Sequence, residues 1–252
     1  MDNKITVGIV GCGFVGGALK QWLEAHNPDV GICVSDPPKG FNDDLSGADV
    51  VFVSIHIPTE RDGSQDITLL KEIIRGLPEQ PIFVRTTILP GTSEALSRET
   101  GRRVYFMPEF LTERTAYSDF CSQPMVFTAE RDLLKRVFVG KAFVEMTSFE
   151  AEVCKYAHNV FGALKVTYFN GVHDYCKKNN ADYGRVLSGI LLSGYVNAAH
   201  TAVPGPDGKS GYGGKCFPKD VNALTKMTVG YPLNSLLAPL QPLNIAFRGG
   251  DE

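Results

Sequence analysis

A glycine-rich segment late in the chain, residues 211–220 (Gly-Tyr-Gly-Gly-Lys-Cys-Phe-Pro-Lys-Asp), combines residue types that suit covalent chemistry. Cys216 stands two residues before a proline that favours the first turn of a helix, so we expect its thiol at a helix N-terminus. The helix dipole and the neighbouring Lys215 and Lys219 would favour the reactive thiolate there. Asp220 would lie close to Cys216 on the first helical turn. The segment therefore predicts a nucleophile, against the alternative of a buried structural cysteine.

Two further pairs of polar residues have a spacing of four. Lys155 and Asn159 would project from one face of a helix, where an ammonium and an amide can stabilise a developing oxyanion. Glu109 and Glu113 follow the end of a predicted strand, which is where ligands bind in doubly wound sheets. The alternative for both pairs is an ordinary solvated surface.

A dinucleotide-binding motif lies near the start of the chain. Gly11, Gly13 and Gly16 form Gly-x-Gly-x-x-Gly between a predicted strand and a predicted helix. Such glycines allow a tight turn, close approach of a pyrophosphate and close packing of helix on strand. Asp36 follows twenty residues after Gly16, where a carboxylate binds ribose hydroxyls and favours NAD over NADP, although Lys39 could soften that preference. A glycine turn without a ligand is the alternative.

The secondary structure predicted from the sequence changes near residue 148, from alternating strands and helices to helices alone. Before it, short apolar runs alternate with helical stretches such as 18–26 and 68–76, which predicts an α/β fold with a Rossmann-like, doubly wound parallel sheet. The predicted strands are 5–10, 31–35, 50–55, 82–87, 104–107 and 125–128. We therefore expect an NAD-binding domain over residues 1–147 and an all-helical central domain over 148–252.

The second part begins with a helix of about seven turns, because apolar residues recur there at steps of three and four. This helix, over residues 150–178, would form a homodimer interface, with a long core helix within one chain as the alternative. The apolar stripe comprises Val153, Ala157, Val160, Phe161, Leu164, Tyr168, Val172 and Tyr175.

Length and composition narrow the class of protein. The chain has 252 residues, enough for one or two domains with a real core. Its 25 basic and 28 acidic side chains give a net charge of −3, which argues against nucleic acid or an anionic membrane as partner. The six cysteines form no metal-ligand pattern, and no apolar stretch reaches the ~18 residues of a membrane span. We expect a cytoplasmic protein with reduced thiols and no metal.

Together these motifs resemble the UDP-glucose/GDP-mannose dehydrogenase family. Residues 211–220 resemble its nucleophile loop, and Lys155-x-x-x-Asn159 its lysine–asparagine pair. The stretch from Pro108 (Pro-Glu-Phe-Leu-Thr-Glu-Arg-Thr-Ala) resembles its substrate-binding segment, and that from Arg85 (Arg-Thr-Thr-Ile-Leu-Pro-Gly-Thr) its Lys-Ser-Thr segment. The matches run in family order from Lys4 to about Asn244.

The resemblance implies a four-electron oxidation of a sugar 6-hydroxymethyl group to a carboxylate with two NAD, through a thiohemiacetal and a thioester on Cys216. The substrate would be a nucleotide sugar such as UDP-glucose, held in part by the loop from Asp207 to Gly213. The implied catalytic residues are Cys216, Lys155, Asn159, Glu109, Asp220 and Thr87. The implied cofactor-binding residues are Gly11, Gly13, Phe14, Val15, Gly16, Asp36, Lys39, Pro58, Thr59, Thr86 and Glu113. The implied substrate-binding residues are Glu109, Phe110, Leu111, Glu113, Lys155, Asn159, Tyr212 and Gly213.

The chain also departs from the family pattern. Family members usually continue into a third domain, whereas this sequence stops soon after the nucleophile helix, so we expect either a truncated fragment or a short form without the C-terminal UDP-binding domain. His56 stands in Ser-Ile-His-Ile-Pro-Thr, where the family has Asn-Thr-Pro-Thr, and Arg85 replaces a lysine. His200 occupies the segment where many relatives place a substrate-contacting arginine of the neighbouring subunit. Two other functions remain open: a single-oxidation β-hydroxyacid dehydrogenase, which needs no thiol, and a nonenzymatic NAD-binding module.

Overall fold

The computed structural model describes residues 4–60 and 63–249. Within these, the chain divides into two compact units. The first contains residues 4–58 and 65–155, and the second contains residues 59–60, 63–64 and 156–249. The division falls inside one helix, and the predicted domain boundary at residue 148 stays a prediction.

The first unit is built on a six-stranded sheet in the order β3-β2-β1-β4-β5-β6. Its strands are β1 (Thr6–Val10), β2 (Gly31–Asp36), β3 (Phe41–Asn42), β4 (Val50–Val53), β5 (Ile82–Val84) and β6 (Val104–Phe106). Five strands are parallel, and only the short edge strand β3 runs antiparallel to β2. The strand order reverses at β1 and β4, which is the topological switch point of a Rossmann-type sheet. The predicted fold class is confirmed.

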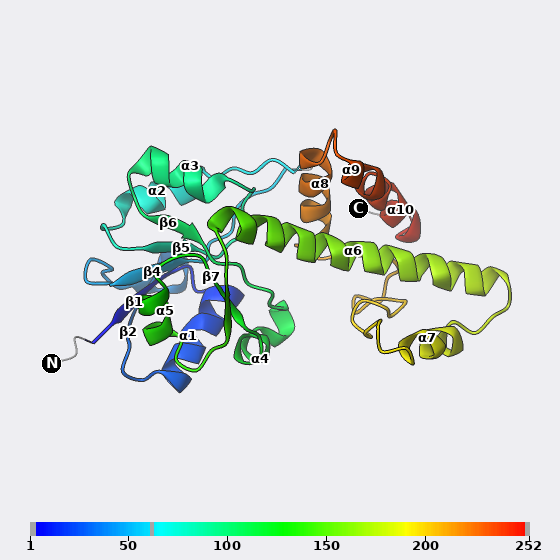
Figure 1. The fold of residues 1–252 in the computed structure, drawn as a ribbon, viewed down its shortest axis with the longest axis horizontal. Helices are drawn as coiled ribbons and strands as arrows, with labels where there is room; N and C mark the ends of the chain where they lie inside the picture. Colours follow the sequence, from blue (N-terminus) through cyan, green and yellow to red (C-terminus); the bar gives the residue numbers. More distant parts are fainter. Residues whose placement is uncertain (1–3, 61–62, 250–252) are drawn as a thin grey trace. The chain divides into compact units, whose positions relative to one another are not determined.

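Helices cover both faces of this sheet (Figure 1). One face carries α1 (Phe14–His26), α4 (Ala116–Ser122) and α5 (Arg131–Val137). The other carries α2 (Thr68–Gly76) and α3 (Thr92–Thr100). Strands buried on both faces explain why β1, β4 and β5 read as nearly continuous apolar runs in the sequence.

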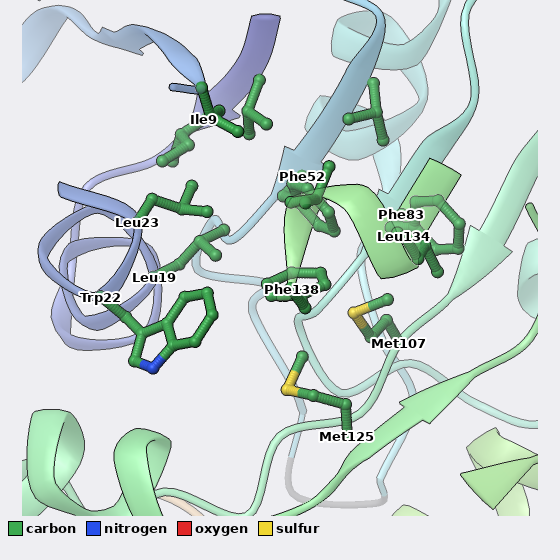
Figure 2. Close-up of a cluster of buried hydrophobic side chains, with 14 of the residues drawn as sticks. Ile9, Leu19, Trp22, Leu23, Phe52, Phe83, Met107, Met125, Leu134 and Phe138 are labelled. Carbon is green, nitrogen blue, oxygen red and sulfur yellow. The ribbon is translucent and has the colours of Figure 1, made fainter. Parts of the chain in front are cut away.

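The larger core lies between the sheet and α1. Figure 2 shows Leu19 and Leu23 of α1 directed towards the sheet, with Trp22 below them. Phe52 of β4 packs against Phe138, with ring centroids 5.6 Å apart and the rings nearly perpendicular. These contacts hold α1 against the sheet, and the glycine motif lies where β1 ends and α1 begins.

All six predicted strands are present, and two short strands were not predicted. The run at 125–128 forms β7 (Met125–Phe127), which pairs with the unpredicted β8 (Phe143–Glu145) in a separate two-stranded parallel sheet. The other unpredicted strand is β3, which has two residues. Strands of two or three residues are too short to show a period, so only their pairing defines them.

The second unit is helical, as predicted. The long helix α6 (Ser148–Lys178) has 31 residues, begins in the first unit and continues into the second from Tyr156. It is followed by α7 (Tyr183–Leu191), α8 (Phe217–Met227), α9 (Pro232–Leu237) and α10 (Leu240–Phe247). A small core joins α6 to α8, α9 and α10 through Val160, Ala163, Tyr212, Val221, Leu237 and Leu240.

The predicted apolar stripe of α6 is largely not its core face. Val160 is buried, whereas Phe161, Tyr168 and Tyr175 are 65%, 63% and 69% exposed. The residues that pack within the chain lie on another face and include Ala163 and Phe169. The helix therefore carries two apolar faces, and the long-core-helix alternative accounts for only one of them.

No helix among the described residues is long and apolar enough to cross a membrane. The six cysteines, all within the described part of the chain, are free thiols.

Candidate active site

The glycine motif forms a tight turn between β1 and α1. Gly11 has a φ of +83°, and its N–H donates to the Ser35 carbonyl at 2.9 Å. A Cβ on Gly16 would overlap the Gly11 carbonyl, so the helix can start this close to the strand only with glycine at that position. A Cβ on Gly13 would instead face open space, with its nearest neighbour, the Lys39 ammonium, at 4.0 Å.

Asp36 reaches this turn from the end of β2. Its Oδ2 accepts from the Cys12 backbone N–H at 2.7 Å, and Lys39 Nζ lies 3.7 Å from the same oxygen. Lys39 also donates to the Cys12 carbonyl at 2.7 Å. The residues predicted to hold the cofactor's ribose and pyrophosphate are thus adjacent at the switch point.

These residues fit a dinucleotide. Gly13 is the N-cap of α1 and has no side chain with which to cap the first-turn N–H groups, so they can bind an anion. The open space at Gly13 allows the pyrophosphate to approach the backbone, and the Asp36 carboxylate accepts ribose hydroxyls.

The loops after β4 and β5 meet beside this turn. Thr86 Oγ1 donates to the Ile55 carbonyl at 2.6 Å, which joins the two loops. Gln65 Nε2 donates to the Thr87 carbonyl at 3.0 Å, and its Oε1 accepts from the Leu89 N–H at 3.1 Å. Gln65 thereby orders the segment that carries the predicted catalytic Thr87, a role that no sequence pattern indicated.

Lys155 and Glu109 form a buried ion pair in the first unit. Lys155 Nζ lies 2.9 Å from Glu109 Oε1, and the two side chains are 4% and 8% exposed. Nζ also donates to the Glu109 backbone carbonyl and lies 5.5 Å from the centre of the Phe110 ring. Glu109 Oε2 accepts from the Leu111 N–H at 2.7 Å. The solvated-surface alternative is wrong for Glu109 and Lys155.

Arg85 adds a second buried cation near Glu109. Burial lowers the pKa of its guanidinium to about 10, and the charge of Glu109 opposes that shift. Arg85 Cζ lies 5.2 Å from the centre of the Phe120 ring, and Nη1 lies 4.0 Å from the Met107 sulfur. The Glu109 carboxylate therefore acts on two buried cations, Lys155 through a direct ion pair and Arg85 through its charge alone.

Asn159 and Asp220 form the corresponding contact in the second unit. Asn159 Nδ2 donates to Asp220 Oδ2 at 2.7 Å, and Lys219 Nζ lies 2.6 Å from Asp220 Oδ1. The Asp220 side chain is fully buried. The two lysines beside Cys216 were predicted to act on its thiol, but Lys219 is in an ion pair that balances a buried carboxylate.

Cys216 is the N-cap residue of α8, as predicted, with an exposed side chain and Pro218 in the first helical turn. The backbone carbonyl of Cys216 accepts from the Asp220 N–H at 3.1 Å, which ties the cysteine to the first turn. The buried-cysteine alternative is wrong.

The remaining predicted site residues belong to several different elements. Phe14 and Val15 begin α1, and Pro58 follows the loop after β4, where its carbonyl accepts from the Asp66 N–H at 3.1 Å. Thr59 lies in the second unit. Glu113 begins a short 3-10 helix (Glu113–Thr115) and is exposed. Phe110 and Leu111 are half-buried beside Glu109. Tyr212 and Gly213 belong to the glycine loop, which comprises residues 205–214.

Two residues that no sequence motif singled out contact that loop. Asn170 of α6 and Asn244 of α10 are both buried and bind the backbone of Gly211 and Tyr212. The signal in the sequence was an asparagine among apolar residues in each helix, because a buried amide needs partners. His200 lies outside the helices with a φ of +62°, and its ring packs edge-on against Phe217.

The sequence is similar to known nucleotide-sugar dehydrogenases. Residues 149–241 match the central-domain model of the UDP-glucose/GDP-mannose dehydrogenase family. The chain is 33% identical over 215 residues to a UDP-glucose 6-dehydrogenase of Rhizobium meliloti, covering 74% of this chain and 48% of the relative. It is 29% identical to a GDP-mannose 6-dehydrogenase of Pseudomonas aeruginosa, covering 71% and 46%. The chain thus spans about half the length of the curated relatives it matches.

The fold is also that of other solved structures. A UDP-glucose dehydrogenase from Pyrobaculum islandicum superposes with a TM-score of 0.81 at 23% identity, covering 98% of this chain and 69% of the other. A UDP-N-acetyl-mannosamine dehydrogenase from Staphylococcus aureus gives a TM-score of 0.70 at 17% identity, covering 96% and 68%. At these identities the likeness establishes the fold.

Proposed function

Since the chain is related to the UDP-glucose/GDP-mannose dehydrogenases and carries the central domain of that family, we propose that it oxidises the 6-hydroxymethyl group of a nucleotide sugar, UDP-glucose, to a carboxylate. The observation that supports this most directly is the pairing of the predicted polar residues as Lys155–Glu109 and Asn159–Asp220. Lys155 and Asn159 lie one turn apart on α6, and Asp220 lies on the first turn of the helix that Cys216 caps.

Bound NAD would supply the hydride acceptor for two successive oxidations. The glycine turn at the start of α1 would hold its pyrophosphate, and Asp36 would hold its ribose and repel a 2′-phosphate. Residues Phe14, Val15, Lys39, Pro58, Thr59, Thr86 and Glu113 would complete the binding surface.

In the first oxidation, Lys155, with a water molecule, would assist removal of the hydroxyl proton. Its ammonium lies against Glu109, whose carboxylate offsets the positive charge while the water accepts the hydroxyl proton. A primary amide has two N–H groups, so Asn159 can keep its hydrogen bond to Asp220 and still donate to the sugar oxygen. Lys155 and Asn159 would thus stabilise negative charge on that oxygen.

Cys216 would then hold the aldehyde. Its sulfur adds to the carbonyl carbon to form a thiohemiacetal, and loss of a hydride and a proton from that adduct leaves a thioester. Water attacks the thioester carbon, the carbon–sulfur bond breaks, and the acid and the free thiol are released. Glu109 and Asp220 would orient and activate this water, with Thr87 helping to position it.

The stoichiometry of NADH tests the proposal. The full chain is incubated with NAD and either UDP-glucose or GDP-mannose, and NADH formed is counted per sugar consumed. Two NADH per UDP-glucose is expected. One NADH would instead indicate a single-oxidation dehydrogenase, and NAD binding without turnover of either sugar would indicate a nonenzymatic module.

A cysteine variant tests the covalent step separately. Cys216→Ser should stop the reaction at or before the aldehyde stage, because a neutral hydroxyl is a far weaker nucleophile than a thiolate. Cys121→Ser is the matched control, since Cys121 is also exposed but lies on α4. Normal acid formation by Cys216→Ser would contradict the thioester route.

We further propose that α6 forms a homodimer through its exposed apolar face. Phe161, Tyr168 and Tyr175 are spaced by seven residues and are each more than 60% exposed, which is a large apolar surface to leave in water. Tyr168→Glu should convert a dimer to a monomer in light scattering. Val229→Glu, at a site that is 70% exposed but outside α6, should leave the dimer intact. A wild-type monomer at micromolar concentration would contradict the proposal.

A further inference from the structure

The backbone of the glycine loop is held by two buried asparagines. The loop comprises residues 205–214, and both asparagines belong to the same unit as the loop. Asn170 is 3% exposed and Asn244 is 7% exposed, so each amide group depends on protein partners rather than on water. Both direct their side-chain oxygens at backbone N–H groups of the loop.

Asn244 pairs with both backbone groups of one loop residue. Its Oδ1 accepts from the Tyr212 N–H at 2.6 Å, and its Nδ2 donates to the Tyr212 carbonyl at 2.9 Å. A planar amide that meets a residue's N–H and C=O together acts like a neighbouring strand. Asn244 thereby fixes the direction of the chain at Tyr212, which leaves little rotation of either adjoining peptide group.

Asn170 holds the preceding residue from a different helix. Its Oδ1 accepts from the Gly211 N–H at 2.9 Å, and its Nδ2 donates to the Val166 carbonyl one turn earlier in α6 at 2.8 Å. The second bond orients the amide, so the oxygen is presented to the loop. Two successive loop N–H groups are therefore bound by side chains from α6 and α10.

A third contact lies beside the next glycine. The Arg248 guanidinium covers Gly213 so closely that a Cβ there would be 2.9 Å from Nη1 and 3.1 Å from Cζ. Arg248 Nη2 also donates to Asp207 Oδ2 at 3.0 Å, near the start of the loop. The loop is thus fixed along its length up to Gly213.

Cys216 is held by other means. It is the N-cap of α8, and three residues, Gly213, Gly214 and Lys215, separate it from Tyr212. A Cβ on Gly214 would meet nothing within 4 Å, so movement of the backbone at residues 211–212 can be absorbed at this glycine without displacing the cysteine.

We propose that Asn170 and Asn244 are positioning residues that set the sugar-binding conformation of Gly211–Gly213 and do not tune the nucleophile. This rests on the proposed function, in which the same backbone lines the sugar site. Loss of either contact should therefore weaken binding of the nucleotide sugar, with the reactivity of Cys216 unchanged.

The experiment compares three variants by titration calorimetry with UDP-glucose. Asn170→Leu removes the acceptor for the Gly211 N–H, whereas Asn170→Asp keeps an oxygen there. Asn179→Leu is the matched control, because Asn179 makes the same bond to a carbonyl one turn back, that of Tyr175, at an exposed position away from the loop. Alkylation of Cys216 by iodoacetamide is measured in each.

Asn170→Leu should raise the Kd for UDP-glucose about ten-fold, which corresponds to ~1.4 kcal/mol. Asn170→Asp and Asn179→Leu should bind within two-fold of wild type, and all four proteins should alkylate at the same rate. If Asn170 only stabilised the fold, Asn170→Asp would bind UDP-glucose more weakly than Asn170→Leu. The reason is that a buried carboxylate destabilises a fold more than a leucine of similar size. Hydrogen exchange should also show the Gly211 amide exposed in Asn170→Leu alone.

Three results would overturn the proposal. Unchanged UDP-glucose binding in Asn170→Leu, weaker binding in Asn170→Asp than in Asn170→Leu, or alkylation slowed in parallel with binding would each do so. Absence of UDP-glucose binding by the wild-type chain would contradict the proposed function, and the positioning role with it. Wild-type binding together with any of the three results would overturn the positioning role alone.

Discussion

Two adjacent glycines in the first turn of α1 should respond in opposite ways to the same substitution. A Cβ on Gly16 would lie far inside the 3.0 Å below which real Cβ contacts essentially never occur, against the Gly11 carbonyl oxygen, with the carbonyl carbon at 3.1 Å and Ile9 Cγ2 at 3.3 Å. A Cβ on Gly17 would meet only the Cys12 carbonyl oxygen, at 3.9 Å. The two positions share a helix and a sequence context, so they differ mainly in this contact.

The magnitudes follow from two effects of opposite sign. Alanine in place of glycine within a helix gains about 1 kcal/mol of stability. At Gly17 nothing opposes this gain. At Gly16 the overlapping group is backbone and cannot rotate away, so overpacking should cost about 3 kcal/mol, the upper part of its usual range. Gly17→Ala should therefore stabilise the unit by about 1 kcal/mol, and Gly16→Ala should destabilise it by about 2 kcal/mol.

Thermal unfolding separates the two outcomes. At about 2–4 °C per kcal/mol for a chain of this size, Gly17→Ala should raise Tm by a few degrees and Gly16→Ala should lower it by about 4–8 °C. Gly16→Ala should also weaken NAD binding, because the displaced helix no longer presents its N–H groups to the pyrophosphate. Equal Tm values for the two variants would refute the close packing inferred at Gly16.

Two further pairs of variants test how buried and exposed carboxylates affect stability, and how glycines with a positive φ tolerate a side chain. Burial raises the pKa of the Glu152 carboxyl in the folded protein above its value of ~4.3 in the unfolded chain. The contribution of Glu152 to the stability of the fold is therefore fully present below pH ~4.3. It is lost as the pH rises through the pKa of the folded protein. Hydrogen bonds from Thr147 lower the pKa of the Glu150 carboxyl in the folded protein. The contribution of Glu150 to stability is therefore present above the pKa of the unfolded chain and is lost as the pH falls through the lower pKa of the folded protein. Urea unfolding from pH 4 to 8 should show the stability difference between wild type and Glu152→Gln shrinking as pH rises, and that for Glu150→Gln growing. Gly63 and Gly140 both have a positive φ, +83° and +77°. A Cβ on Gly63 would lie 2.6 Å from the Ala223 backbone nitrogen, whereas a Cβ on Gly140 would meet nothing within 4 Å. Both alanine variants should lose about 1–2 kcal/mol to backbone strain, and Gly63→Ala about 1–3 kcal/mol more to overpacking; equal losses would contradict that contact.

Local patterns predicted the elements that position the dinucleotide turn. The alternation of strand and helix, the glycine spacing and the acidic residue twenty positions later all act over short stretches of chain, and each has its expected counterpart in β1, α1 and β2. The proline two residues after Cys216 likewise placed that residue at a helix start. Chemistry that is determined by neighbours along the chain can therefore be predicted from the sequence alone.

Contacts between residues far apart in the sequence could not be predicted from local patterns. Lys155 contacts Glu109 across 46 positions, and Asn244 contacts Tyr212 across 32. Helical periodicity also does not say which apolar face of α6 packs within the chain, because both faces repeat at the same spacing. The stripe that includes Phe161 was found by period, but only the burial of Ala163 and Phe169 shows that most of the core face lies elsewhere.

The ion pair of Lys155 and Glu109 should prove asymmetric when it is taken apart. Glu109 faces two cations, Lys155 at 2.9 Å and the buried Arg85, whose pKa its charge raises. Glu109→Gln leaves both cations uncompensated and should cost about 3–5 kcal/mol in urea unfolding. Lys155→Met leaves Glu109 balanced by Arg85 and should cost less. The double variant should then be more stable than Glu109→Gln alone, because it leaves one fewer buried charge without a partner. A double variant less stable than Glu109→Gln would show that Lys155 stabilises the fold by its packing, and that Glu109 does not govern the charge balance of this site.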